Sequence, residues 1–482
     1  MKHIFPLILV GLPGLATAQT TPQAVLDEWL VLDTALAGYE MRYDTALNSA
    51  DLIRLENVEI RINFAFPGMS VAETINLEWM SLQANTYGTV TVQHSEMMSG
   101  SVVSQQAVGD QLATGTGQFT AMLRDGQTIV SGIPGAHIYT IDYAEMTAEM
   151  TQSNTANGVE LAATSTQSMR GLHYVIAMSG GPLGRIDMES TLISGDMRQV
   201  QEVAPGDNIT MNMTFGPGTM NGHIDLGFLA TDPMDLAALD AQANMDLNDF
   251  NLQIAADSNV DMTFGLDALT FGGALDASHL AFNANLAGLR VDGTASGLPI
   301  NLGVEVFGYQ FAAPLGAPGS VGAASAGLQI QGFTLGNLLI GLFDPAGTLG
   351  QHPLNLQLTA QGEVTALIDL ATITSGDVLP SPTVLNGSLQ VNGSYGDFDF
   401  EAEGEGENQD GMPVGQATAS ATNLSNFLNK LVQIGLLAPQ QHLMMQGMLG
   451  MLTTPGPTPN SVQSTMEMRP DGSVWVNGQQ MQ

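Results

Sequence analysis

The sequence of 482 residues contains no cysteine. Disulfides, thiolate metal sites and cysteine nucleophiles are therefore excluded. Positive charge is also scarce, because 11 lysine and arginine residues stand against 47 aspartate and glutamate residues, which gives a net charge of −36. A surface of that sign repels nucleic acid and anionic lipid headgroups. We therefore expect no nucleic acid among the partners.

Long apolar runs are missing too, apart from a short one at the start of the chain. Residues 4–15 are mostly apolar, follow Lys2, and precede an A-x-A cleavage site that ends at Ala18. This is the pattern of a secretory signal peptide, which would be removed as residues 1–18. No later run reaches about 18 apolar residues, so we expect no transmembrane segment after the signal peptide. The sequence predicts a periplasmic protein of a Gram-negative bacterium, or a secreted one.

Motifs that carry enzyme chemistry are missing as well. The eight histidines are scattered, and none lies three to five residues from another, as a metal site on one element requires. The nearest approach to a nucleophile elbow is AASAG around Ser325, where Ala323 replaces the first glycine. We therefore predict no catalytic residue, no metal site, no cofactor and no enzyme. A pair of carboxylates that cleaves glycosides stays open as an alternative, because acids are plentiful.

The sequence does contain strict alternation of apolar and polar residues. In ENVEIRINFAF, residues 56–66, every second residue from Val58 onward is apolar. This period places one face of a strand on a core and the other in water, as is typical of antiparallel sheets. Asn-Gly and Asp-Gly pairs, which suit tight hairpins, punctuate the chain. The same alternation recurs at 209–215, 260–266, 280–286 and 354–358.

The alternation changes phase at two points within the predicted strands. Met245 and Leu247 are followed by Phe250, and Leu286 is followed by Leu289. One additional residue at each point keeps the apolar side chains on one face, so the sequence predicts two β-bulges there. Since bulges bend a sheet, we expect a strongly curved one.

Helical periodicity is confined to a few segments. A stripe that contains Trp29 predicts one helix beginning after Thr21, a residue suited to capping. A short helix is predicted near 335–343, where it interrupts the strands. Near the C-terminus a helix pair is predicted over 424–435 and 439–452, followed by a hairpin.

Together these patterns predict a mainly β protein. We expect one or more large curved antiparallel sheets, with the N-terminal helix and the C-terminal helix pair packed on the apolar face. The predicted parts are a signal peptide (1–18), an N-terminal helix with a first β region (19–205), a second β region with the short helix (206–422), and a helix pair with a terminal hairpin (423–482).

Six carboxylates alternate along DFDFEAEGEGE, residues 397–407. On a strand they share one face, while Phe398 and Phe400 share the other. Burial of such a row without cations would cost several kcal/mol per charge, so we expect this face to lie in water. A strand that binds calcium stays open as an alternative.

Methionine is abundant, with 27 residues, many of them on the apolar side of predicted strands or on the last helices. Its flexible, polarisable side chain suits an ordinary core and also an adaptable apolar surface. We expect an apolar groove between sheet and helices that receives a lipid or a peptide. The predicted lining is Trp29, Phe427, Leu431, Met444 and Met448.

Three stretches have a recognisable form: LDEWLVLDTALAGYE near the start, LLIGLFDPAGTLGQHPLNLQLTAQGEV in the middle, and ATNLSNFLNKLVQIGLLAP with GSVWVNGQQM at the end. Through them most of the mature chain resembles an exported alphaproteobacterial family, domain of unknown function 2125. The middle stretch departs from the family in one place, since Gly350 and Gln351 stand where we expect basic residues. The resemblance implies bacterial export and a β-rich body, but no activity and no catalytic residues.

These observations favour a non-enzymatic exported envelope protein that binds an apolar, lipid-like ligand or a protein partner in the periplasm. A structural or assembly factor of the envelope without a ligand is the first alternative. A hydrolase and an outer-membrane barrel are less favoured, the barrel because aromatic residues make up 6% of the chain. Envelope proteins that handle lipid also use long amphipathic sheets closed by helices, which is an analogy of fold alone.

Overall fold

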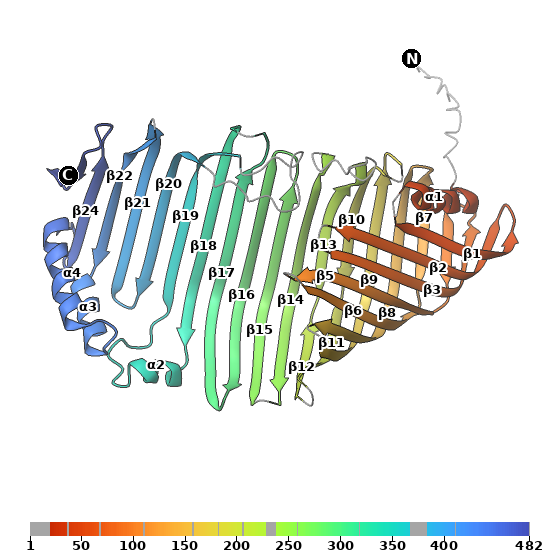
Figure 1. Ribbon diagram of the computed structural model, residues 1–482, viewed down its shortest axis with the longest axis horizontal. Helices are drawn as coiled ribbons and strands as arrows, with labels where there is room; N and C mark the ends of the chain where they lie inside the picture. Colours follow the sequence, from red (N-terminus) through yellow and green to blue (C-terminus); the bar gives the residue numbers. More distant parts are fainter. Residues whose placement is uncertain are drawn as a thin grey trace, which may run out of the picture.

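The computed structural model shows the described part of the chain as one antiparallel β-sheet with four helices (Figure 1). The predicted signal peptide, with Ala18, lies outside the described residues. The structure describes residues 20–481 except 36–37, 67–68, 109–110, 157–158, 182, 205–206, 228–237, 258, 318, 367–382 and 410.

The elements follow one another along the chain with these bounds. The first strands are β1 (Tyr39–Asn48), β2 (Leu52–Phe66), β3 (Met69–Ala84), β4 (Val90–His94), β5 (Met97–Val108), β6 (Gln111–Arg124), β7 (Gln127–Ile133), β8 (Ala136–Ala156), β9 (Val159–Ser179), β10 (Arg185–Leu192), β11 (Ser194–Ala204), β12 (Asp207–Phe215) and β13 (Gly218–Asp225). The later strands are β14 (Ala241–Ala256), β15 (Val260–Leu275), β16 (His279–Ala295), β17 (Leu298–Pro314), β18 (Val321–Leu335), β19 (Leu354–Thr365), β20 (Val384–Tyr395), β21 (Phe398–Gln409), β22 (Met412–Thr422), β23 (Thr454–Pro455), β24 (Ser461–Met468), β25 (Val474–Val476) and β26 (Gln479–Gln480). The helices are α1 (Pro22–Ala35), α2 (Asn337–Phe343), α3 (Leu424–Gln433) and α4 (Pro439–Leu452).

The two halves of the sheet differ in how their strands pair. From β14 to β22 the chain is a meander, in which each strand pairs with the next one. The N-terminal half is branched, because β3 pairs with β5 along one part and with β4 along another, and β9 pairs with both β10 and β11. Within the described residues, β1 forms one edge of the sheet, and β23 and β26 form the other.

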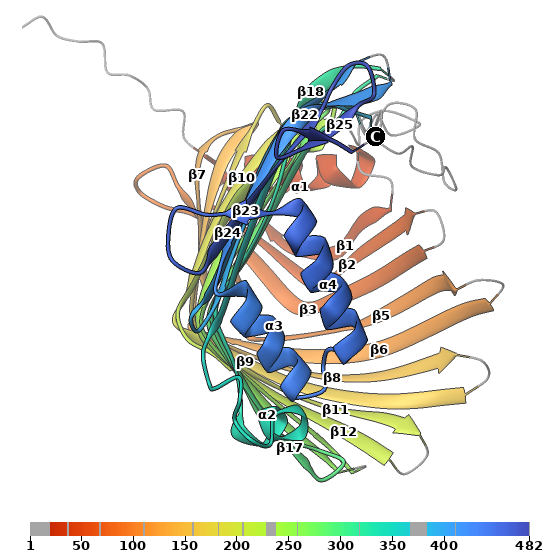
Figure 2. The same ribbon diagram turned by 90° about the vertical axis from the view of Figure 1, so that its left-hand side faces the viewer.

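The sheet is bent into a trough. Figure 2 looks along its long axis and shows the strands curving around one side, with α1, α3 and α4 on the concave side. We call this side the concave face and the other side the convex face. The predicted fold class is therefore confirmed, with the N-terminal helix and the C-terminal helix pair on the same face of one curved antiparallel sheet.

The long strands in the middle of the sheet share a break in their ladders. Asp249 on β14, Gly288 on β16 and Gly332 on β18 have positive φ angles of 51°, 63° and 66°. The ladders skip these residues together with Asp267 and Glu305 on the strands between them. Partner residues on the two sides of the break keep the same register from β14 to β18.

This shared break confirms the predicted changes of phase but corrects the predicted bulges. A bulge gives one strand a residue more than its neighbour, whereas these strands change phase side by side. The apolar side chains resume on the same face, so the long strands can bend together. Gly288 fits the break because a Cβ on it would lie 2.0 Å from Oδ2 of Asp267, and because its φ of 63° is one that L residues rarely adopt.

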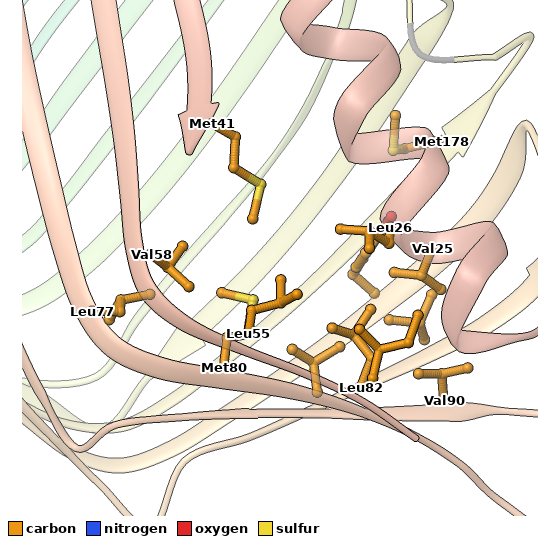
Figure 3. Close-up of a cluster of buried hydrophobic side chains, with 14 residues drawn as sticks. Val25, Leu26, Met41, Leu55, Val58, Leu77, Met80, Leu82, Val90 and Met178 are labelled. Atoms are coloured by element: carbon orange, nitrogen blue, oxygen red, sulfur yellow. The ribbon is translucent and has the colours of Figure 1, made fainter. Parts of the chain in front are cut away.

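A core of buried apolar side chains lies under α1 (Figure 3). Val25 and Leu26 of the helix pack against Leu55, Leu82 and Val90 of the sheet, and none of these is more than 4% exposed. Burying such aliphatic side chains contributes about 1.5–3 kcal/mol each. The remaining members of this core are Met41, Ile53, Val58, Leu77, Met80, Val92, Val130, Tyr139 and Met178.

The predicted part boundaries fall within this continuous architecture. The boundary after residue 205 lies between β11 and β12, which pair with each other, and the boundary after residue 422 lies between β22 and α3. The short helix predicted near 335–343 is α2, and the predicted terminal hairpin is formed by β24 and β25.

Candidate apolar groove

The concave face carries rows of apolar side chains that run across the strands. In the clearest row, each residue is the registered partner of the next, so the stripe is continuous from β13 to β22. Cross-strand neighbours of this kind lie about 5 Å apart. The row consists of Met220, Met245, Phe271, Ala284, Tyr309, Leu328, Leu358, Val391, Ala402 and Ala419.

The concave face is covered at its N-terminal end and bare along much of its length. Under α1, Leu82 is fully buried. In the C-terminal half, Phe271, Tyr309 and Leu389 are 37%, 41% and 47% exposed on the same face. Contiguous apolar surface of this extent is uncommon on soluble proteins and marks sites of ligand, membrane or protein contact. This bare part of the concave face, from β13 to β24, is the candidate groove.

The groove deepens into a hollow of about 790 Å³ between β17 and β24. Pockets for small molecules span about 300–1,000 Å³, so a ligand fits. The walls are mostly apolar side chains, which favour hydrocarbon over polar groups. They include Phe311, Val384, Leu389, Ala417 and Met466.

Four glycines in register form the floor of the hollow, because they have no side chains and leave the backbone of adjacent strands exposed. Gly362, Gly387, Gly406 and Gly415 pair in that order across β19, β20, β21 and β22. A Cβ on Gly415 would lie 2.2 Å from the backbone oxygen of Glu405, which leaves no room for a side chain. The depth of the hollow thus follows from the sequence at these positions.

The convex face of the same strands is hollowed as well, but its lining is charged. The space of about 1,200 Å³ is lined by Glu363, Glu405, Glu407 and Glu467, with Arg469 at its side. Among the described residues, no three histidine, aspartate or glutamate side chains converge as a metal site would require. The two faces of one thin sheet therefore differ sharply in polarity.

The acidic row on β21 lies on the convex face, exposed to solvent. Side chains from Asp399 to Glu407 alternate between exposed acids and half-buried or small residues, as the pattern predicts. The strands on both sides set uncharged polar residues opposite the first acids, such as Asn392 and Ser420 beside Glu401. Like charges therefore meet along the strand and not across it, which limits their repulsion.

Asp397 departs from this row, because β21 begins one residue later. Its Oδ1 lies 3.3 Å from Nζ of Lys430 on α3. The hydrogen bond from Lys430 lowers the pKa of the Asp397 carboxyl below its ordinary range. Asn426 of α3 also donates to this carboxylate, so Asp397 ties α3 to the turn before β21.

The structure places the predicted groove residues at two ends of the molecule. Trp29 lies on α1, partly buried against the N-terminal core. Phe427 on α3 stacks on Phe398 of β21, with ring centroids 4.4 Å apart. Leu431 on the same helix is half-buried, and Met444 and Met448 on α4 are largely exposed. The structure thus brings the four C-terminal residues near one another on the helix pair and keeps Trp29 apart from them (Figure 1).

A buried polar cluster under α1 was not predicted from the sequence. Nδ1 of His137 on β8 lies 2.6 Å from Oε2 of Glu28 on α1, and both side chains are at most 5% exposed. The Tyr139 hydroxyl donates to Oε1 of Glu28 (3.3 Å), and Nε1 of Trp29 donates to that hydroxyl (3.2 Å). The backbone N–H of Gly135 donates to Oε2 of Glu28 at 3.3 Å.

This cluster fixes α1 to the sheet by polar contacts as well as by apolar packing. Nε2 of His137 is buried and has no hydrogen-bond partner among the described residues. The sequence holds a weak signal for the cluster: Glu28 stands between the apolar residues of the helix, and His137 occupies an inward position of an alternating strand. A buried polar residue of that kind requires a partner, but the sequence does not say which one.

Burial and the nearby carboxylate of Glu28 raise the pKa of the Tyr139 phenol well above its ordinary value of 10.0. The neutral phenol therefore stabilises the fold fully below pH 10, and this contribution is lost as the pH rises above that value. We expect the free energy of unfolding to fall more gently above pH 10 in Tyr139→Phe than in the wild type. Urea unfolding at pH 9 to 11 measures both slopes. Tyr87→Phe, at a tyrosine 92% exposed, should keep the wild-type slope; equal slopes for Tyr139→Phe and the wild type would contradict the prediction.

No family model and no curated protein sequence matches the chain. Among solved structures, the crystal structure of the outer membrane transporter YddB from Escherichia coli is similar at 7% sequence identity, over 88% of this chain and 72% of that chain, with a TM-score of 0.14. A TM-score this low carries no argument about fold or function. Among the residues that the structure describes, none of the helices combines the length and the hydropathy of a membrane-spanning helix.

Proposed function

We propose that the protein is a non-enzymatic exported protein of the bacterial envelope that holds an apolar, lipid-like ligand in the candidate groove. The observation that carries the proposal is the continuous apolar stripe from β13 to β22, which is bare and deepens into a hollow of about 790 Å³. A periplasmic location follows from the predicted signal peptide and from the resemblance to domain of unknown function 2125, and it belongs to the proposal.

The shape of the groove favours extended hydrocarbon chains over compact ligands. Registered apolar partners repeat about every 5 Å across the sheet, so an acyl chain laid along the row meets apolar contacts over its whole length. Each methylene removed from water contributes about 0.8 kcal/mol. The net charge of −36 disfavours anionic headgroups, so we propose a zwitterionic or uncharged lipid.

Leu389→Glu tests this proposal, with Gln390→Glu as the matched control. Both add one carboxylate to exposed positions of β20, but Leu389 lines the hollow on the concave face and Gln390 points to the convex face. A carboxylate in an apolar site loses its hydration, so we expect Leu389→Glu to retain at least about tenfold less lipid. Mass spectrometry of organic extracts from the purified periplasmic protein measures the retained lipid per mole.

Gln390→Glu should retain as much lipid as the wild type. Equal retention in both variants would show that lipid is not held in this hollow. Clean extracts from the wild type would instead favour the alternative of an envelope assembly factor without a ligand.

A further inference from the structure

Helix α4 presents a broad apolar face, although it lies at the surface. Leu443, Met444, Met448 and Met451 are 68%, 62%, 47% and 70% exposed, and no residue of the helix is buried. Exposed apolar side chains that gather in one patch mark a site of contact with a membrane, a ligand or a protein. We call these four residues the outer face of α4.

The opposite side of α4 packs on the rest of the fold and fixes the position of the outer face. The opposite stripe of α4, which includes Met445 and Leu449, is half-buried, and Figure 2 shows α4 beside α3 on the concave side. Helix α3 in turn is anchored by the buried Leu428, by the stacking of Phe427 on Phe398, and by the ion pair of Lys430. The apolar outer face is therefore a fixed part of the fold that lacks a cover.

The charge of the chain changes abruptly in the segment that contains α3 and α4. Residues 411–466 hold no aspartate and no glutamate, although the whole chain has 47 acids in 482 residues. The charged side chain in this segment is that of Lys430. Carboxylates on the rest of the protein surface are repelled by lipid phosphates. The segment that contains α4 has no carboxylate side chains, so this repulsion is absent there.

We propose that the outer face of α4 inserts into the interface of a phospholipid bilayer and docks the C-terminal end of the groove on that membrane. Flexible methionine side chains adapt to a fluid apolar layer, and burial of an apolar helix face is how peripheral helices bind membranes. A second copy of the chain is a poor cover, because it brings another net charge of −36. The exchange of a ligand with this membrane rests on the proposed function, whereas the docking itself does not.

Vesicle flotation of the full mature protein tests the docking. We expect the protein to float with phosphatidylcholine vesicles, and the quadruple variant Leu443→Gln, Met444→Gln, Met448→Gln and Met451→Gln to float at least about tenfold less. Glutamine has nearly the helix propensity of leucine and methionine, so α4 should persist. The matched control carries Tyr87→Gln, Met97→Gln and Ile193→Gln, which remove exposed apolar side chains far from α4, and it should float like the wild type.

A second measurement keeps the proposal testable if the quadruple variant folds poorly. The Met448→Trp variant should show blue-shifted emission from this position on addition of vesicles, after subtraction of the wild-type spectrum. Flotation of the quadruple variant at the wild-type level, or no flotation of the wild type, would overturn the docking. A wild-type dimer that the quadruple variant converts to a monomer in light scattering would also overturn it, in favour of a second copy.

Lipid extraction separates this proposal from the proposed function. The quadruple variant should keep the co-purified lipid that Leu389→Glu loses, and Leu389→Glu should still float. Flotation that depends on α4 together with clean extracts would support the docking and contradict the ligand. Loss of lipid in Leu389→Glu together with a wild type that does not float would do the reverse.

Discussion

Leu82→Ala is expected to lower the free energy of unfolding by about 2–5 kcal/mol, whereas Leu389→Ala is expected to change it by less than about 1 kcal/mol. Both leucines belong to the concave face of one sheet. Leu82 is fully buried under α1, so its truncation leaves a cavity, but Leu389 is 47% exposed in the bare groove and its truncation leaves none. The two expected changes in the free energy of unfolding differ because α1 covers Leu82 and leaves Leu389 bare, although both leucines lie on strands of the same sheet.

Urea unfolding followed by tryptophan fluorescence measures this difference. Trp29 and Trp79 lie in the N-terminal half, so the signal reports mainly on the part of the sheet that contains Leu82. The midpoint should shift for Leu82→Ala at an unchanged m-value, which indicates that the same surface is exposed on unfolding. Equal shifts for the two leucines would mean that the groove is covered by something that the structure does not contain.

Glu28→Ala is expected to destabilise the protein by about 3–5 kcal/mol, because it breaks a buried pair and leaves its partners without an acceptor. His137 is wholly buried and would lose the contact of its Nδ1, and the N–H of Gly135 and the hydroxyl of Tyr139 would lose theirs. Glu28→Gln should cost less, since the amide oxygen still accepts hydrogen bonds.

Asp27→Ala is the matched control for Glu28→Ala. Asp27 precedes Glu28 on the same helix but is exposed, and Gln23, one turn earlier, donates a hydrogen bond to its carboxylate. A pair of this kind contributes about 0.2–0.5 kcal/mol. Thermal unfolding at pH 7 compares the variants, and a loss in Asp27→Ala as large as that in Glu28→Ala would refute the assigned role of the buried cluster.

Much of the fold could be predicted from local patterns, because apolar and polar residues alternate along each strand of the meander and so identify its two faces. The alternation around Phe264 and Leu286 identifies strands, and the phase changes near Asp249 and Gly288 locate the shared break. The pattern of one strand does not show whether the neighbouring strands change phase at the same level. A change of phase in one strand looks like a bulge until its neighbour is known to change at the same level.

The candidate groove was harder to predict for the same reason. Leu82 and Leu389 both stand in alternating strands, and only the position of α1 makes one of them core and the other groove surface. The contact between Glu28 and His137 joins residues 109 positions apart, so no local spacing indicates it. Helix α1, which carries Trp29, and helix α4, which carries Met444, both lie on the concave side of the sheet but at opposite ends of it (Figure 1).

The meander from β14 to β22 makes the molecule modular. Each of these strands depends on its immediate neighbours, so a hairpin can be inserted or deleted there while the cross-section stays the same. One hairpin changes the span by about 10 Å, twice the spacing between strands. Insertion or deletion of hairpins, in evolution or by engineering, can thus change the length of the sheet in steps of that size.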